Sequence, residues 1–185
     1  QAGPEAESII GDISKKYFVT STKYSDGYQY ISSVTDEFGN TTKYEYDYVS
    51  GLLEKVIDAK NISTNYIYDE YERLTQILTN SRKITYTYDT KGRVQTVEVG
   101  NLNNYIKYQF TYNGYNDIVS ITSTSNNDIG YQNIISYEYY IYNDLYTGLY
   151  SKIIYPNGTY IRYEYDDQLN TSKVFEKNSP NEERS

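Results

Sequence analysis

The 185-residue sequence contains no cysteine, histidine, tryptophan or methionine. Without cysteine and histidine the chain has no thiolate nucleophile, no Ser-His-Asp triad and no Cys/His zinc site, since each of these needs a group that titrates or binds metal near neutral pH. Acid–base or nucleophilic chemistry would have to come from carboxylates, lysines or tyrosines. The absence of cysteine fits an exported chain and a cytosolic chain equally well.

Basic residues and long apolar runs are also scarce. Lysine and arginine together number 17, against 25 aspartates and glutamates, which gives a formal net charge of -8. A field of this sign repels phosphate backbones and anionic lipid, so we do not expect nucleic acid as a partner. No segment approaches the roughly 20 apolar residues of a membrane helix, and the N-terminus lacks the pattern of a signal peptide, so we expect no membrane insertion. If the protein acts outside the cell, we expect this sequence to be a piece of a longer exported chain.

Tyrosine, by contrast, is abundant, with 27 residues against four phenylalanines. Codon bias would scatter these tyrosines, but they recur in one unit, aromatic-x-Tyr-Asp/Asn. The copies of this unit are Tyr44-Glu-Tyr46-Asp47, Tyr66-Ile-Tyr68-Asp69, Tyr86-Thr-Tyr88-Asp89, Phe110-Thr-Tyr112-Asn113, Tyr140-Ile-Tyr142-Asn143 and Tyr163-Glu-Tyr165-Asp166. The main feature of the chain is therefore an internal repeat.

A second marker, an apolar-x-x-apolar pair, follows each tyrosine unit. The pairs are Leu53/Val56, Leu74/Ile77, Val94/Val97, Ile118/Ile121, Tyr150/Ile153 and the weaker Thr171/Val174. An earlier pair, Ile31/Val34, indicates a truncated seventh copy. Most intervals are about 20–24 residues and one is longer, a period typical of architectures in which one supersecondary unit is added to the next.

The segment TYTYDTKGRVQTV predicts the structure of one repeat. Tyr86 and Tyr88 alternate with threonines, which favours a strand with both rings on one face. Asp89 begins a turn, and Gly92 tolerates the positive φ of a three-residue hairpin loop that ends in a glycine bulge. This loop pairs Asp89 with Arg93, and we expect an exposed charge pair that contributes about 0.2–1 kcal/mol.

The other repeats follow the same plan with different loops. Gly51 and Gly148 are expected to end longer loops, whereas Glu72, Asn116 and Leu169 stand where the glycine is missing. The sequence therefore predicts an all-β chain of tandem antiparallel hairpins. The predicted hairpins cover residues 44–56, 66–77, 86–97, 110–121, 140–153 and 163–174.

Taken together, these markers resemble the YD repeats of the Rhs family. The resemblance rests on Y-x-Y-D-x-x-G-R-L/V and on linkers such as D-E-F-G-N-T-T-K-Y and P-N-G-T-Y-I-R-Y, and it covers residues 22–176. The family includes bacterial cell-wall-associated Rhs proteins, the encapsulating components of insecticidal Tc toxins, and animal teneurins. The sequence departs from the pattern at the missing glycines, at Asn113 and Asn143, and in its long fifth interval.

The resemblance implies an open, curved sheet that spirals into a shell, which in full-length relatives encloses a C-terminal toxin or other cargo. The implied partners are neighbouring repeats of the same parent chain and an enclosed toxin domain, and the implied location is secreted or at the cell surface. Residues 1–21 would be a lead-in and 177–185 a polar tail. The family's self-cleaving aspartyl core, with its D-P-x-G motif, has no counterpart in this sequence. We therefore expect a non-catalytic piece of shell without metal or cofactor.

Two features admit other interpretations. Exposed tyrosine rings would suit a glycan-binding, adhesin-like module, although rings at identical hairpin positions favour packing between repeats. The turn residues Asp47, Asp69, Asp89 and Asp166 would suit catalysis or calcium binding, although repetition of one unit favours turn capping. Finally, a hairpin at the end of an open sheet has unpaired backbone groups, so we expect the isolated chain to self-associate through its ends.

Overall fold

The computed structural model describes residues 19–179 except Tyr28, Leu102, Ile129 and Tyr131, together with residues 182–184; side chains are described as far as Lys177. Within these ranges the chain has fifteen strands and no helix. Each strand is hydrogen-bonded to its neighbours in the sequence, which gives an open antiparallel sheet with the strand order β1 to β15. No helix that could cross a membrane is present in the described part of the chain.

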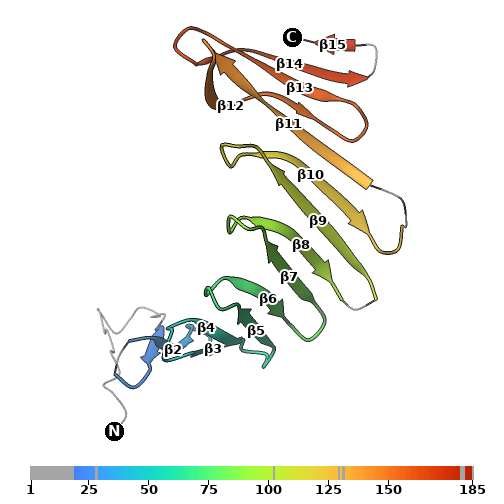
Figure 1. Ribbon diagram of the computed structural model, residues 1–185. Helices are drawn as coiled ribbons and strands as arrows, with labels where there is room; N and C mark the ends of the chain where they lie inside the picture. The colour runs from blue at the N-terminus through green and yellow to red at the C-terminus, as the bar shows by residue number, and fades with distance from the viewer. Residues whose placement is uncertain are drawn as a thin grey trace. The chain divides into compact units, whose positions relative to one another are not determined.

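The chain divides into two compact units, residues 1–85 and 86–185, with the boundary inside β7. The strands of the first unit pair in chain order, and Figure 1 shows this most clearly for β5 and β6. These strands are β1 (Ser21–Tyr24), β2 (Ile31–Thr35), β3 (Thr41–Tyr46), β4 (Leu53–Ile57), β5 (Ser63–Tyr68), β6 (Leu74–Leu78) and the start of β7 (Lys83–Tyr88).

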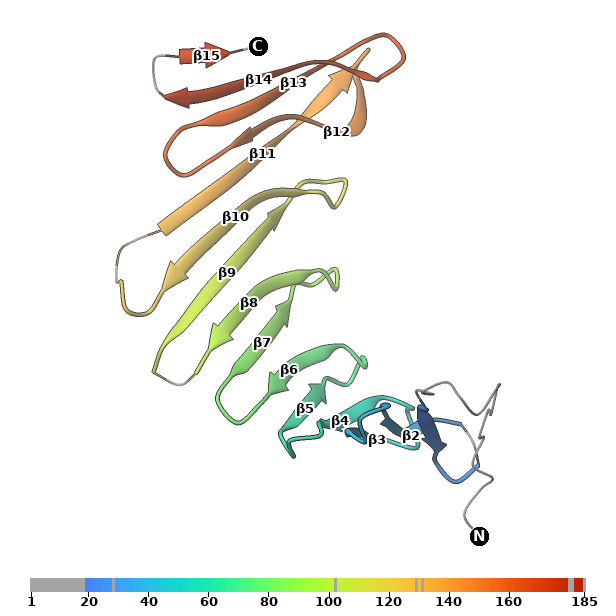
Figure 2. The same cartoon turned by 180° about the vertical axis from the view of Figure 1, so that it is seen from behind.

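The second unit continues the same plan with longer strands. After the end of β7, its strands are β8 (Val94–Gly100), β9 (Tyr105–Tyr112), β10 (Ile118–Ser125), β11 (Gln132–Tyr142), β12 (Leu145–Ile154), β13 (Tyr160–Tyr165), β14 (Thr171–Ser179) and β15 (Glu182–Arg184). The view from behind in Figure 2 shows the same order of neighbours within this unit. Within the described residues, each strand therefore pairs with the strands that precede and follow it in the chain.

Strand register separates the side chains onto two faces, because residues that lie opposite each other in neighbouring strands point to the same side of a sheet. One face, here called the tyrosine face, carries the tyrosines and the aliphatic pairs. It comprises Tyr44, Tyr46, Leu53, Val56, Tyr66, Tyr68, Leu74 and Ile77 in the first unit, and Val97, Tyr108, Phe110, Tyr112, Ile118, Ile121, Tyr137, Ile153, Tyr163 and Val174 in the second. The other face, here called the polar face, carries pairs such as Glu45 with Lys55 and Thr111 with Ser120.

The extent of side-chain burial is limited because the sheet is a single layer. No side chain in the described part of the chain is fully buried. The tyrosines of the tyrosine face are half-buried by their neighbours in the same sheet, because no second layer packs on them among the described residues. Contacts along this face therefore take the place that an enclosed hydrophobic core holds in most domains of this length.

The predicted all-β fold, an open sheet of tandem antiparallel hairpins, is confirmed, but the predicted loop of the fifth hairpin is wrong. Its turn is the two-residue Asn143-Asp144, which brings Tyr142 opposite Leu145. Both turn residues have positive φ, 48° and 62°, which a two-residue hairpin turn requires and which Asn and Asp tolerate better than most residues. Gly148 therefore ends no loop. It lies within β12 at a φ of 75°, beside an irregularity in the β11–β12 register.

The chain ends also contribute strands. Residues 1–18, most of the predicted lead-in, lie outside the described residues, and β1 begins at Ser21. Where the sequence suggested a polar tail at 177–185, β14 continues to Ser179 and pairs with β15, with Ser179 opposite Glu182. The described sheet thus extends beyond the region that carries the tyrosine repeat.

Candidate functional site

The aspartates of the repeat lie in the hairpin turns, where each caps backbone N–H groups. In the third hairpin the Asp89 Oδ1 atom accepts hydrogen bonds from the backbone N–H of Lys91 at 2.8 Å and of Arg93 at 3.0 Å. Asp69 and Asp166 cap their own turns in the same i+2 and i+4 pattern. These carboxylates satisfy turn donors that no strand can reach.

Asn113 shows that the turn needs an oxygen acceptor rather than a charge. Its Oδ1 atom accepts from the backbone N–H of Tyr115 at 2.9 Å and of Asp117 at 3.0 Å, as an aspartate would. Asp47 caps a loop that is one residue longer, and its Oδ1 atom accepts from Val49 and Ser50. The same capping also occurs at the opposite edge of the first unit, where Asp36 and Asp58 begin the return turns.

The third loop position of these turns has positive φ whichever residue occupies it. Gly92 has a φ of 80°, and Glu72, Asn116 and Leu169 have φ values of 62°, 73° and 64° at the equivalent place. In each case the backbone N–H of this residue donates to the carbonyl of the residue that begins the turn. Repeats without glycine therefore keep the same turn at the expense of backbone strain.

The pair between Asp89 and Arg93 is more buried than the sequence predicted. The Arg93 Nε and Nη2 atoms both donate to Asp89 Oδ2, at 2.7 Å and 2.6 Å, and the two side chains are only 23% and 19% exposed. The guanidinium also lies 4.3 Å from the ring centroid of Tyr112 and donates from Nη1 to Asn116 Oδ1. The prediction of an exposed pair was wrong because the next hairpin along the chain covers the arginine.

Tyrosine hydroxyls connect consecutive hairpins. The Tyr112 hydroxyl donates to the carbonyl oxygen of Val94 at 2.6 Å, and so reaches from β9 across to the return strand of the preceding hairpin. The same contact recurs in both units. The donor and acceptor pairs are Tyr68 with Leu53, Tyr112 with Val94, Tyr139 with Ile118 and Tyr165 with Tyr150. We call these bonds the hydroxyl ladder.

The hydroxyl ladder corrects the assignment of the fifth repeat. The sequence aligned Tyr140 and Tyr142 with the tyrosines of the other copies, but Tyr139 is the residue whose hydroxyl binds the preceding hairpin. Register irregularities on either side of Tyr139 set it apart from the regular pattern of β11. A tyrosine count could not detect this shift, because the strand extends three residues beyond Tyr139 before it turns.

A further tyrosine, Tyr146 on β12, secures the turn of the fourth hairpin. Its hydroxyl is bonded to Asp117 Oδ2 and accepts from Asn113 Nδ2 at 2.9 Å, and its ring stacks on Tyr115 with centroids 4.0 Å apart. This contact could not be predicted from the repeat pattern, because Tyr146 falls between the two repeat markers.

These contacts shift the pKa values of the ladder tyrosines and of the turn aspartates. Burial, the largest cause in each case, raises the pKa of Tyr68, Tyr112 and Tyr165 above the ordinary value of 10.0. The side-chain hydrogen bond from Arg73 lowers the pKa of Asp69. At Asp89 desolvation opposes ionisation, but the hydrogen bonds from Arg93 and from the turn lower its pKa overall. The ladder tyrosines are therefore neutral donors, and these turn aspartates are charged acceptors, at neutral pH.

The repeated side chains of this arrangement pack against one another and cap turns. Among the described residues no three acidic side chains gather as a metal site would require. The repeated aspartates accept hydrogen bonds from their own turns, and the hydroxyls of Tyr68, Tyr112 and Tyr165 donate to carbonyls of the preceding hairpin. These repeated residues do not bring a nucleophile, a base and an oxyanion donor together.

Comparison with known proteins identifies the fold. No protein-family model and no curated protein sequence matches the chain. Among solved structures, TcdB2-TccC3-Cdc42 superposes with a TM-score of 0.53 at 12% identity, over 84% of this chain and 11% of that chain. TcdB2-TccC3 without its hypervariable C-terminal region gives a TM-score of 0.51 at 15% identity, over 86% of this chain and 10% of that chain. This chain thus shares its fold with about a tenth of the length of those proteins.

Proposed function

We propose that the chain is a non-catalytic structural segment of a YD/Rhs-repeat protein, in which it forms part of the wall of a β-sheet shell. The observation that carries the proposal is the hydroxyl ladder, since each of its four bonds joins a hairpin to the one before it. Such a unit is complete only when it has neighbours. A chain built this way forms a continuous wall rather than a separate globular body.

Two independent lines support this proposal. The YD-type repeats resemble the family that includes the encapsulating components of Tc toxins, and solved structures that share the fold include TcdB2-TccC3 complexes. At 12–15% identity the structural likeness concerns the fold alone. The proposed partners are therefore neighbouring repeats of the parent chain and an enclosed toxin or other cargo domain, and the proposed location is secreted or at the cell surface.

The proposal of a non-enzymatic role rests on the way the polar groups are used. The aspartates that recur in the chain cap turns, and three of the recurring tyrosines, Tyr68, Tyr112 and Tyr165, donate to backbone carbonyls. A catalytic group is normally a single residue with a perturbed environment in a cleft, not one residue of a repeated structural set.

Electron microscopy of the protein encoded by the complete gene tests the proposal. We expect a hollow particle whose wall contains this segment, with further repeats on at least one side of it. The proposal fails if the complete gene encodes this chain alone, or if the segment lies in a solid particle with no enclosed space.

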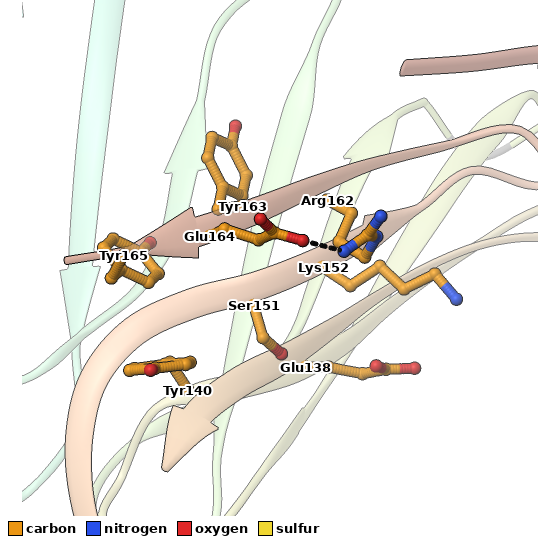
Figure 3. Close-up of a pocket in the computed structure, with 8 residues that line it drawn as sticks. All are labelled: Glu138, Tyr140, Ser151, Lys152, Arg162, Tyr163, Glu164 and Tyr165. Atoms are coloured by element: carbon orange, nitrogen blue, oxygen red, sulfur yellow. Dashed lines mark hydrogen bonds and ion pairs between the residues drawn. The ribbon is translucent and has the colours of Figure 1, made fainter. Parts of the chain in front are cut away.

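A glycan-binding module is the second candidate function. The tyrosine face does not favour it, because the ladder hydroxyls are already bound to carbonyl oxygens. The observation that does favour it is a pocket of the second unit, formed by β11, β12 and β13 and lined by both aromatic and charged side chains (Figure 3). Glycan-array binding by the chain would separate this candidate from a purely structural role.

A further inference from the structure

The residues that the chain lacks leave tyrosine as its most readily oxidised side chain. Cysteine, methionine, tryptophan and histidine, which an oxidant would otherwise attack, are all absent from the sequence, whereas tyrosine occurs 27 times. A one-electron oxidant that meets this protein therefore acts on tyrosine. Which tyrosine reacts depends on its exposure, on a nearby proton acceptor and on a second ring within reach.

Tyr115 and Tyr146 meet these conditions as a pair. Their rings stack in the second unit with centroids 4.0 Å apart and an angle of 1° between the ring planes. Tyr115 lies in the turn of the fourth hairpin and is 67% exposed, so an oxidant can reach it. For comparison, the rings of Tyr30 and Tyr46 in the first unit have centroids 4.9 Å apart and planes inclined by 23°. The rings of Tyr115 and Tyr146 are therefore closer and more nearly parallel.

Asp117 supplies the proton acceptor. The Tyr146 hydroxyl donates to Asp117 Oδ2 and accepts from Asn113 Nδ2 at 2.9 Å. Burial, followed by the hydrogen bond to Asp117, raises the pKa of Tyr146, so the phenol keeps its proton at neutral pH until the ring is oxidised. A phenol that loses an electron becomes a strong acid, and this one passes its proton to the carboxylate that already accepts its hydrogen bond.

We propose that Tyr115 and Tyr146 form an oxidative cross-linking site, at which a haem peroxidase and hydrogen peroxide join the two rings as dityrosine. Each ring gives one electron to the peroxidase, while the phenol proton of Tyr146 passes to Asp117 and that of Tyr115 passes to water. The two radicals form a bond between the ring carbons next to their hydroxyls, and the hydrogens on those carbons then restore the hydroxyls. The two electrons and two protons reduce one hydrogen peroxide to two water molecules.

The cross-link joins neighbouring hairpins covalently. Tyr115 belongs to the turn between β9 and β10, and Tyr146 belongs to β12, so the bond ties the turn of the fourth hairpin to the return strand of the fifth. Because the two rings are already in contact, coupling within one chain is favoured over coupling between chains at low protein concentration. Neither tyrosine belongs to the hydroxyl ladder, so the inference does not rest on the proposed shell role.

Treatment of the full chain with a haem peroxidase and hydrogen peroxide tests the proposal. The chain is kept at micromolar concentration, the monomer is separated from cross-linked oligomers by gel filtration in denaturant, and the monomer is then digested on the N-terminal side of aspartate. Asp117, Asp128 and Asp144 lie between the two tyrosines, so digestion separates the tyrosines unless they are bonded to each other. We expect mass spectrometry to find the two peptides joined with the loss of two hydrogen atoms, and fragmentation to place the bond at Tyr115 and Tyr146.

Variants then identify the groups that take part. Tyr115→Phe should abolish the joined peptides. Asp117→Asn should slow their formation by about tenfold or more, because an amide accepts the hydrogen bond but not the proton. The matched control is Tyr48→Phe, which removes a turn tyrosine of similar exposure, 71%, from the first unit and should leave the yield unchanged. Circular dichroism checks that each variant is folded, and the position of the bond in the unaltered chain needs no variant.

Three outcomes would overturn the inference: no joined Tyr115 and Tyr146 peptides in the monomer, cross-links spread equally over other exposed tyrosines such as Tyr48 and Tyr71, or the same rate of cross-linking in folded Asp117→Asn and the unaltered chain. None of these outcomes would bear on the shell proposal, which depends on the hydroxyl ladder and on the parent particle.

Discussion

The tyrosine hydroxyl is the group that distinguishes this repeat from an ordinary aromatic packing motif. A phenylalanine would fill the same half-buried position on the tyrosine face but would leave the carbonyl of the preceding hairpin without its donor. The sequence contains 27 tyrosines and four phenylalanines. The ladder gives a physical reason for part of that excess, because phenylalanine has no hydroxyl to donate to the carbonyl of the neighbouring hairpin.

Replacing one ladder tyrosine by phenylalanine tests this reason. Tyr112→Phe should lower the free energy of unfolding by about 0.5–1.5 kcal/mol, the usual net contribution of one intramolecular hydrogen bond. Urea denaturation measures it, and Tyr48→Phe is the control, because Tyr48 is 71% exposed in a turn. Equal midpoints for the two variants would mean that the ladder contributes no stability.

Gly92 is the residue at which turn geometry restricts the sequence most directly. Its φ of 80° forces a β-branched side chain into a strained conformation, so Gly92→Val should destabilise the chain by about 1–3 kcal/mol. Thr90→Val provides the control in the same loop, because Thr90 is exposed and is not among the residues with positive φ. Similar denaturation midpoints for both variants would contradict the turn described for this hairpin.

At the scale of the strand and hairpin, the fifth repeat offers a second test of backbone strain. Gly148 has a φ of 75° and open space where a Cβ would lie, so Gly148→Ala should cost about 1 kcal/mol through conformation alone. Gly114, which also has open space but no positive φ, should tolerate alanine without loss. Thermal unfolding of the two variants compares them directly, and the same melting temperature in both would contradict this account of β12.

The hairpins could be predicted from the sequence because the residues within each repeat determine its local structure. Alternating tyrosines define a strand, Asp or Asn caps the turn, and the apolar pair returns on the same face, so no knowledge of distant contacts is needed. Glu72 and Leu169 could be placed by analogy for the same reason. Their positive φ shows that the turn is determined by its capping residue and register more than by glycine.

The contacts between hairpins could not be predicted in the same way. Whether Tyr139 or Tyr142 reaches the preceding hairpin depends on the register irregularities and on the two-residue turn, which shift the strand relative to the repeat. The burial of Arg93 depends on Tyr112 and Asn116, which belong to another repeat. The pocket lined by Tyr140 and Tyr165 also depends on this irregular hairpin, so the regular repeat markers do not predict it.

At the scale of the whole molecule, the turn carboxylates should make stability depend on acid. Asp69, Asp89 and Asp166 have pKa values below their ordinary value of 3.8 in the fold. A carboxyl whose folded pKa is lowered adds stability above its unfolded pKa, and that stability is lost as pH falls through the folded value. We therefore expect the urea midpoint to fall steadily below about pH 4.

The substitution Asp69→Asn tests the contribution of the carboxylate charge separately from that of the hydrogen bonds that cap the turn. The amide oxygen retains the turn hydrogen bonds, as Asn113 does, but it cannot be protonated in this range. The variant should be less stable than the unaltered chain at neutral pH. Its urea midpoint should fall less than that of the unaltered chain as the pH is lowered. A midpoint that stays constant as the unaltered chain is acidified would contradict the assignment.

The one-layer sheet should also affect association in solution. Since no described side chain is fully buried, the tyrosine face and the sheet ends keep apolar surface and backbone groups that a second copy can cover. We expect concentration-dependent association, which light scattering over a dilution series measures. A strictly monomeric chain at high concentration would show that these surfaces are protected within the chain itself.

The strand order, which follows the chain order without a crossover, has a consequence for how the protein is made and moved. Every strand pairs only with segments adjacent to it in sequence, so each hairpin can form as soon as its own residues are available. Contacts of short sequence separation also form quickly, because little loop entropy opposes them. A chain of this kind can fold progressively as it emerges from a ribosome or a narrow export channel, and can unravel one strand at a time from either end.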